Sequence, residues 1–264
     1  MSDDAHEPVP TEPWEILRRL TPARVALGRT GASLPTREVL RFGYAHALAR
    51  DAVHAGLDVA AVATALRATG LSLNKVTSAA GDRATYLRRP DLGRRLSPEG
   101  RDRLTAFQQA PCDIAIVVAD GLSATAVHAN AAVLVEALLR GIAARGWTLA
   151  PVTIATQARV ALGDEVGALL KSRLALVLIG ERPGLSAPDS LGAYLTYAPR
   201  PGRRDHERNC VSNIRSAGLV PDRAADNILW LMGEAMRRAE TGVALKDESQ
   251  DIEVLPPVGT PSLP

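Results

Sequence analysis

Two short apolar runs constrain the fold of this chain more than any other feature of its sequence. Residues 113–120 read DIAIVVAD and residues 174–179 read LALVLI, so each has the length of a strand and almost no polar residue. Strands that are apolar on both faces are typical of parallel sheets, in which helices cover both sides. The sequence therefore predicts an α/β fold with a mainly parallel sheet.

The segments around these runs alternate between helical and strand character, as a parallel sheet requires. Two weaker strands are predicted at residues 148–154 and 193–197. Helical spacing of apolar residues predicts helices at residues 123–145, 164–172 and 221–240. Together these elements predict a Rossmann-like domain with a mainly parallel sheet over residues 111–245.

The chain before residue 111 is predicted to be mainly helical. Thr36 is expected to cap one helix, Asp58 to cap a second that runs to about Ala68, and a short helix is expected near Glu99 to Gln109. Residues 21–35 contain several small and turn residues and are expected to be irregular. We therefore expect a helical N-terminal region over residues 21–110.

Both ends of the chain differ from the regions between them. The first residues are polar, acidic and proline-containing, and a short amphipathic helix with Trp14, Leu17 and Leu20 on one face follows them. Such a helix is too short to be stable alone, so residues 1–20 are interpreted as a flexible tail and a docking helix. Residues 246–264 turn acidic and then proline-rich, which is typical of a C-terminal tail.

Charge and cysteine usage exclude several classes of function. The net charge is only +2, and acidic residues are interspersed with abundant arginine, so a nucleic-acid surface is not expected. Two isolated cysteines, Cys112 and Cys210, favour a reduced cytosolic protein. The N-terminus does not have the pattern of a signal peptide, and no apolar run reaches the roughly 20 residues that span a bilayer, so no membrane contact is expected.

The common motifs of nucleotide, metal and hydrolase sites are missing. No G-x-G-x-x-G follows the strand at residues 113–120, and the chain has no G-x-x-x-x-G-K-[ST]. The GLSAT sequence at Ser123 lacks the second glycine of a hydrolase elbow. The five histidines lie singly, without the spacing of a metal site: His6, His46, His54, His128 and His206.

Three segments next to predicted strands have the composition of ligand-binding loops. Residues 120–124 (DGLSA) form either a tight turn capped by Ser123 or a ligand contact. In residues 180–186 (GERPGLS), Glu181 either accepts hydrogen bonds from a ligand or pairs with an arginine such as Arg182. In residues 208–215 (RNCVSNIR), Cys210 is either a buried structural thiol or, with His206 as its base, a catalytic one.

Four longer strings, in their order along the chain, carry a resemblance to a known family. They are LTPARVALGRTGASLPTREVLRFGYAHALARDAV, DIAIVVADGLSATAV, VLIGERPGLSAPDSLGAYLTY and DHERNCVSNIR. These strings closely resemble the light chain of ethanolamine ammonia-lyase, and the likeness extends from about Thr21 to Lys246.

The resemblance implies a function, a cofactor and a partner. Enzymes of this family convert ethanolamine to acetaldehyde and ammonia with adenosylcobalamin, which lies between the light chain and a large TIM-barrel subunit that holds the substrate. Cobalamin contacts then fall on Val160, Glu181 and Cys210, and residues 111–245 become a cobalamin-contacting domain. The resemblance implies no catalytic residue and no metal ligand from this chain. It implies a cytoplasmic hetero-oligomer, within a bacterial microcompartment or outside one.

Two other functional classes are compatible with a Rossmann-like domain. One is a stand-alone nucleotide-binding enzyme, and the other is a purely structural assembly subunit without cofactor contact. Measuring activity and cobalamin binding of the purified chain, with and without the large subunit, separates these possibilities.

Overall fold

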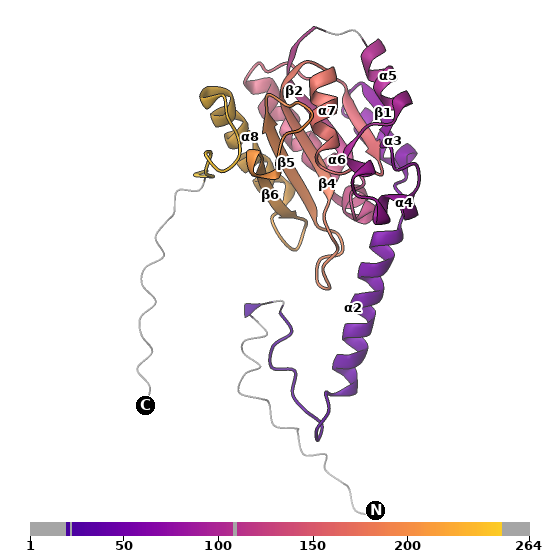
Figure 1. The fold of residues 1–264 in the computed structure, drawn as a ribbon. Coiled ribbons are helices and arrows are strands. Elements are labelled where there is room, and N and C mark those ends of the chain that lie inside the picture. The colour runs from indigo at the N-terminus through magenta and orange to yellow at the C-terminus, as the bar shows by residue number, and fades with distance from the viewer. Residues whose placement is uncertain (1–19, 22, 108–109, 250–264) are drawn as a thin grey trace, which may run out of the picture.

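A computed structural model describes residues 20, 21, 23–107 and 110–249 of the chain. Its centre is one six-stranded sheet with the order β1-β3-β2-β4-β5-β6 (Figure 1). The four strands from β1 to β4 are parallel, whereas β5 is antiparallel to β4 and β6 is antiparallel to β5. The strands are β1 Leu73–Thr77, β2 Cys112–Ala119, β3 Val152–Thr156, β4 Ser172–Gly180, β5 Leu191–Tyr197 and β6 Asn209–Ile214.

Helices cover both faces of this sheet. The cluster of buried apolar residues on one face includes α3, α6 and α8, and the cluster on the other face includes α5 and α7. The α-helices are α2 Thr36–His54, α3 Val59–Arg67, α4 Arg83–Arg88, α5 Pro98–Ala106, α6 Ala124–Ala144, α7 Leu162–Leu169 and α8 Pro221–Arg238. Two 3-10 helices are η1 Leu92–Arg94 and η2 Asp205–Glu207.

The layers explain why the central strands lack polar residues. In β2, Ile116 and Val118 belong to the cluster under α6 and α8, while Val117 and Ala119 belong to the cluster under α7. Successive side chains of a strand point to opposite faces, so a strand covered on both sides must be apolar at every position. The prediction of an α/β fold from these runs is confirmed.

The strand order places one particular strand end at the middle of the sheet. The chain leaves β2 for β3 on one side and then crosses to β4 on the other side of β2. The carboxyl ends of β2, β3 and β4 therefore lie at one edge, where the connections from β2 diverge. Open α/β sheets bind their ligands in such crevices.

Several predicted helix boundaries agree with the structure. Asp58 caps α3 by accepting from the backbone N–H of Ala61, and Ser123 caps α6 by accepting from Ala126. Residues 23–35 lack helices and strands, apart from an isolated bridge between Thr30 and Ser33. The predicted docking helix falls largely outside the described residues, as do His6 and most of the C-terminal tail.

Other predictions need correction. Thr36 does not cap α2, because it is the first helical residue and Pro35 occupies the cap without a side-chain hydrogen bond. Residues 73–77 form a strand within the region expected to be helical. Residues 209–214, interpreted as part of a loop, form the edge strand β6. The sheet is mixed rather than mainly parallel at this edge, because β5 and β6 are joined by short connections that reverse the chain.

Helix α2 stands apart from the rest of the molecule (Figure 1). Only Glu38, Ala45 and Ala52 are buried along its 19 residues. Several large apolar and aromatic side chains of this helix are exposed. The exposed fractions are 52% for Val39, 68% for Leu40, 48% for Phe42, 69% for Tyr44 and 40% for Leu48.

Helix α6 is the one helix in the described ranges that is long and apolar enough to span a membrane. Half of the relevant window is buried inside the protein, where α6 packs against the sheet and α8. The composition of α6 is thus accounted for by its place in the core.

Candidate functional site

The turn after β2 and the end of β4 are locked together through their backbones. Leu122 donates its backbone N–H to the carbonyl of Gly180 at 2.9 Å. Gly121 has a positive φ of 57°, and a Cβ added there would lie 2.2 Å from the Gly180 oxygen. A Cβ at Gly180 would lie 2.0 Å from the oxygen of Ser123. Only glycine fits at both positions, so the DGLS and IGER strings form one unit.

Hydrogen bonds hold the two ends of the loop after β4, residues 181–190. Glu181 donates its backbone N–H to Ser190 at 3.0 Å. From α6, the amide of Asn130 donates to the Asp189 carbonyl at 2.9 Å. The Ser123 hydroxyl, which also caps α6, donates to the Pro188 carbonyl at 2.7 Å. The tight turn capped by Ser123 is therefore present, and the same side chain also anchors the neighbouring loop; a ligand contact by residues 120–124 stays a prediction.

Asp120 ties the end of β2 to the segment that follows β3. It is only 2% exposed, and its carboxylate accepts from the backbone N–H groups of Gln157 at 2.8 Å and Ala158 at 3.0 Å. The Arg83 guanidinium lies 3.6 Å from the carboxylate. Burial raises the pKa of Asp120 despite these contacts. Its role is to position residues 157–161, which lead into α7.

Tyr86 contacts residues 157–161 through a hydrogen bond to Ala158. The ring is fully buried, and its hydroxyl donates to the Ala158 carbonyl at 3.2 Å. The guanidinium groups of Arg83 and Arg159 lie over the ring, with distances of 4.9 Å and 4.4 Å to its centroid. These cation–π contacts fix Arg159, the residue before Val160.

Glu181 does not take the arginine partner considered for it. Its Oε2 accepts from the Ser190 hydroxyl at 2.5 Å and from the backbone N–H of Asn213 at 3.3 Å. Arg182 is exposed, and no ion pair to Glu181 occurs within the described part of the chain. The carboxylate instead connects the start of the loop to β6.

Glu181 and Cys210 lie on the same face of the sheet, with Tyr194 between them. Tyr194 pairs with Cys210 across β5 and β6, and its phenol group lowers the pKa of the neighbouring thiol. A Cβ at Gly192, one residue pair away on this face, would lie 2.9 Å from Oε1 of Glu181. The missing side chain at Gly192 thus makes room for the carboxylate.

The environment of Cys210 does not favour a thiolate. Although the residue as a whole is exposed, desolvation of its thiol raises the pKa; Tyr194 acts in the opposite direction, and the charge of Glu181 raises the pKa further. At neutral pH the group is a protonated thiol, which argues against a nucleophilic role. Cys210 is exposed, whereas Cys112 is buried in β2.

Val160 lies in the turn before α7. It is partly buried against the apolar cluster under α7, as is Tyr194. All three residues predicted as cobalamin contacts, Val160, Glu181 and Cys210, are therefore on the α7 face of the sheet. This face is open over β6, where Cys210 and Ser212 are both exposed.

Sequence reasoning missed most of the residues that hold this site. Ser190, Tyr194 and Asn213 contact the predicted residues only because β4, β5 and β6 are neighbours. Arg83 and Tyr86 lie on α4, in the region expected to be helical, and neither was singled out from the sequence. For Asn213 the sequence offered one signal, which concerns its backbone. Asparagine is among the residues that tolerate a positive φ, and the φ of Asn213 is 57°.

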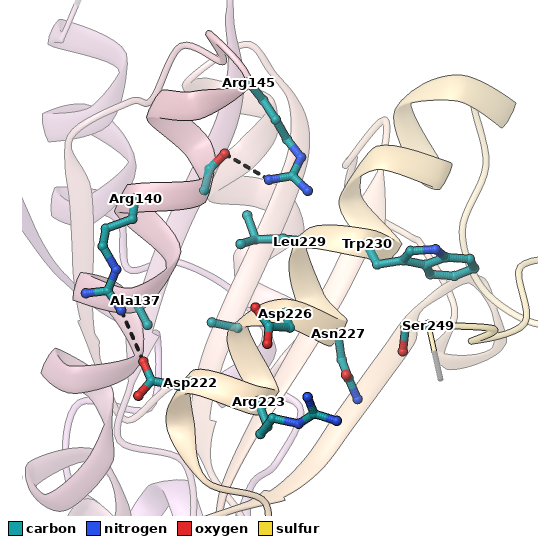
Figure 2. Close-up of a pocket in the computed structure, with 12 residues that line it drawn as sticks. Ala137, Arg140, Arg145, Asp222, Arg223, Asp226, Asn227, Leu229, Trp230 and Ser249 are labelled. Carbon is teal, nitrogen blue, oxygen red and sulfur yellow. Dashed lines mark hydrogen bonds and ion pairs between the residues drawn. The ribbon is translucent and has the colours of Figure 1, made fainter. Parts of the chain in front are cut away.

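A groove lies on the opposite face of the sheet, between α6 and α8 (Figure 2). It encloses about 930 Å³, and its charged side chains come from both helices. Arg140 pairs with Asp222 at 3.1 Å, and Arg145 donates to the carbonyl of its own helix at Gly141. It contains none of the residues that the sequence singled out as ligand contacts.

The described residues contain no group of three or more histidine, cysteine or acidic side chains that could hold a metal ion. His128 instead accepts a hydrogen bond from the backbone N–H of Asp58 at 2.9 Å and so joins α6 to α3.

Comparison with known proteins identifies the family. Residues 11–246 match the family model described as ethanolamine ammonia-lyase light chain. The chain belongs to the ethanolamine ammonia-lyase light-chain family. This confirms the resemblance found in the four sequence strings, and nothing in these matches supports a stand-alone nucleotide-binding enzyme.

Similar proteins cover nearly the whole light chain. The ethanolamine ammonia-lyase small subunit of Bradyrhizobium diazoefficiens is 58% identical over 252 residues, which are 95% of each chain. The small subunit of Azotobacter vinelandii is 55% identical over 253 residues, 95% of this chain and 93% of that one. The small subunit of Pseudomonas aeruginosa is 54% identical over 241 residues, 90% and 88% of the two chains.

Proposed function

We propose that this chain is the light subunit of an adenosylcobalamin-dependent ethanolamine ammonia-lyase and that it holds the cofactor against a large subunit, which carries the substrate site. In this proposal residues 111–245, which supply five of the six strands, are a Rossmann-like cobalamin-contacting domain, and residues 21–110 precede them and add the edge strand β1. The observation that carries the proposal is the grouping of Val160, Glu181 and Cys210 on one face of the sheet.

The groups on this face fit a cobalamin. The cofactor combines an apolar corrin rim with amide, ribose and phosphate groups, so its site needs aliphatic walls and a few polar contacts. Glu181 keeps Oε1 available, because its two hydrogen bonds are accepted by Oε2. The buried Oε1 of Gln157 has no hydrogen-bond partner among the described residues and could accept from an amide of the ligand. Gly192 leaves room for the Glu181 carboxylate on this face.

The chemistry of bond cleavage is supplied by the cofactor, whose cobalt–carbon bond yields a radical when bound in the enzyme. The light chain contributes positioning. The interlocked Gly121 and Gly180 fix the backbone under the ligand, and Asp120 fixes the turn that carries Val160. We assign no acid–base role on the substrate to this chain.

The partner surface in this proposal is the exposed face of α2. A 19-residue helix with three buried residues gains little stability from its own chain, so its apolar side chains are available to a second subunit. The segment before α2 reaches the cofactor face, because Arg24 donates to the Leu185 carbonyl at 3.5 Å. A large subunit on α2 would thus continue onto the loop that carries Glu181. We propose a cytoplasmic location, and packaging in a microcompartment stays a prediction.

Substitution of Glu181 tests the proposal. In the assembled enzyme, Glu181→Gln should weaken adenosylcobalamin binding modestly and Glu181→Ala more strongly. Losing a hydrogen bond to a charged acceptor costs about 1.5–3 kcal/mol, or roughly one to two powers of ten in affinity. The Michaelis constant for ethanolamine at saturating cofactor should stay the same.

Glu234→Gln on α8 is the matched control. Like Glu181, Glu234 is a carboxylate with polar partners, here Arg237 at 2.6 Å, but it belongs to a helix on the other face of the sheet. If Glu181 only stabilises its loop through Ser190 and Asn213, Glu181→Ala loses thermal stability yet binds cobalamin normally once folded. Unchanged affinity in that variant would rule out the contact.

A further inference from the structure

A second pocket on the α7 face carries an unusual concentration of arginine. It encloses about 560 Å³ between η1, the start of α7 and the loop before η2. Four arginines line it, Arg94, Arg95, Arg203 and Arg204. Gly202 forms an open part of its wall, since a Cβ there would meet no atom within 4 Å.

The positive charge of this pocket is only partly compensated. Its lining contains two carboxylates, Glu165 and Asp205, against the four guanidinium groups, which leaves 4 − 2 = 2 positive charges. The Glu165 carboxylate is already bonded to groups outside the lining, because it accepts from the Arg101 guanidinium and from the backbone N–H of Leu96.

The remaining pairs leave two arginines available. Arg203 is held by Glu207, and Arg94 lies 3.9 Å from Asp205. No ion pair of Arg95 or Arg204 occurs among the described residues, and both side chains are exposed. A guanidinium presents a planar fork of donors that matches two oxygens of a phosphate.

The pocket borders the proposed cofactor site. Ala161 in its lining is the neighbour of Val160, and the backbone N–H of Arg159 donates to Gly93 in η1 at 2.8 Å. On the other side, the charge of Asp205 contributes to raising the pKa of Tyr194, the partner of Cys210. The pocket therefore directly adjoins Val160, one of the three residues assigned to cobalamin.

We propose that this arginine pocket binds a phosphate group, namely the phosphodiester of the cobalamin nucleotide, with Arg95 and Arg204 as its donors. The inference rests on the proposed function and adds to it the residues that recognise the anionic part of the cofactor. Free inorganic phosphate shares the same chemistry, so the experiment must separate the two sources.

Three corrinoids that differ in the phosphate provide the test in the assembled enzyme. Adenosylcobinamide lacks the phosphate, ribose and base; adenosylcobinamide phosphate restores the phosphate; adenosylcobalamin has the complete nucleotide. Affinity is measured by the change in corrinoid absorbance on titration. We expect the Arg95→Gln, Arg204→Gln double variant to lose roughly 10- to 100-fold in affinity for the two phosphate-containing corrinoids. Its affinity for adenosylcobinamide should stay that of the unsubstituted enzyme.

Arg200→Gln is the matched control, because Arg200 is an exposed arginine of the same loop that does not line the pocket. The proposal is overturned if the double variant keeps the ratio of affinities between adenosylcobinamide phosphate and adenosylcobinamide. It is also overturned if the variant loses only the ability of inorganic phosphate to bind the cofactor-free complex.

Failure of the pocket assignment can be told apart from failure of the proposed function. If Glu181→Ala weakens all three corrinoids while the arginine variants change none, only the phosphate site is wrong. If neither Glu181→Ala nor the arginine variants affect any corrinoid, cofactor binding by this chain is wrong, and the phosphate assignment is wrong with it.

Discussion

The buried ion pair between Arg208 and Asp164 should be the most sensitive polar contact behind the cofactor face. Asp164 is 1% exposed and Arg208 is 7% exposed. The guanidinium donates to both carboxylate oxygens, at 2.5 Å and 2.7 Å, and also to Thr196 at 2.9 Å. This pair joins the segment leading into β6, and hence Cys210, to the first turn of α7.

Arg208→Met removes the guanidinium while keeping most of the aliphatic stem, so Asp164 stays buried without its partner. Breaking one side of a buried pair costs about 3–5 kcal/mol of unfolding free energy. For a domain of this size each kcal/mol corresponds to about 2–4 °C, so we expect the melting temperature to fall by roughly 6–20 °C. Urea unfolding of the purified light chain at neutral pH, followed by circular dichroism, measures the loss.

Two further variants make the result decisive. Arg208→Met with Asp164→Leu removes both charges and should recover much of the loss, because no buried charge is left alone. Arg173→Met breaks an ion pair with Asp113 at 3.0 Å in which the arginine is 51% exposed, and should cost less than about 1 kcal/mol. The reasoning fails if Arg208→Met is no more destabilising than Arg173→Met, or if the double variant is no better than the single one.

Two other predictions concern Cys210 and the N-terminal region. Because the pKa of Cys210 is raised, little thiolate is present near pH 8. Alkylation of Cys210 by iodoacetamide in the cofactor-free enzyme should therefore be slower than that of free cysteine and should accelerate as the pH rises. Bound cobalamin should protect Cys210 from this reaction. Peptide mass spectrometry with Cys210→Ser as a control follows the reaction, and rapid modification at pH 7 would contradict the prediction. Deleting residues 1–11 should leave co-purification of the large subunit intact, whereas deleting residues 1–35 should weaken it; equal recovery with both deletions would refute a docking role for this region.

The parts of the fold that follow from local sequence were predictable. The apolar runs at β2 and β4 specify buried strands, and Asp58 and Ser123 mark helix starts by their ability to accept from backbone N–H groups. Strand β1 was missed because it is an edge strand with Asn74 and Lys75 among its five residues. Such a strand is stabilised by pairing with β3, which local composition does not reveal.

The contacts around the candidate site could not be predicted from the sequence. The family resemblance named Glu181 and Cys210, but Ser190 and Tyr194 enter only through the register of β5. The alternative in which Glu181 pairs with Arg182 followed from their adjacency in sequence. The structure instead turns the carboxylate toward Ser190, a residue brought close by the reversal of the chain after β4.

The exposed side chains of α2 also bear on how this protein must be produced. Leu40 and Tyr44 are each about two-thirds exposed, and Phe42 lies between them on the same helix. Copies made in excess of the partner subunit proposed to cover this helix would expose an apolar surface, through which they would associate with one another and with chaperones. The amounts in which the two polypeptides are made should therefore govern how much soluble protein a cell accumulates, and overexpression of this chain alone should lower its soluble fraction.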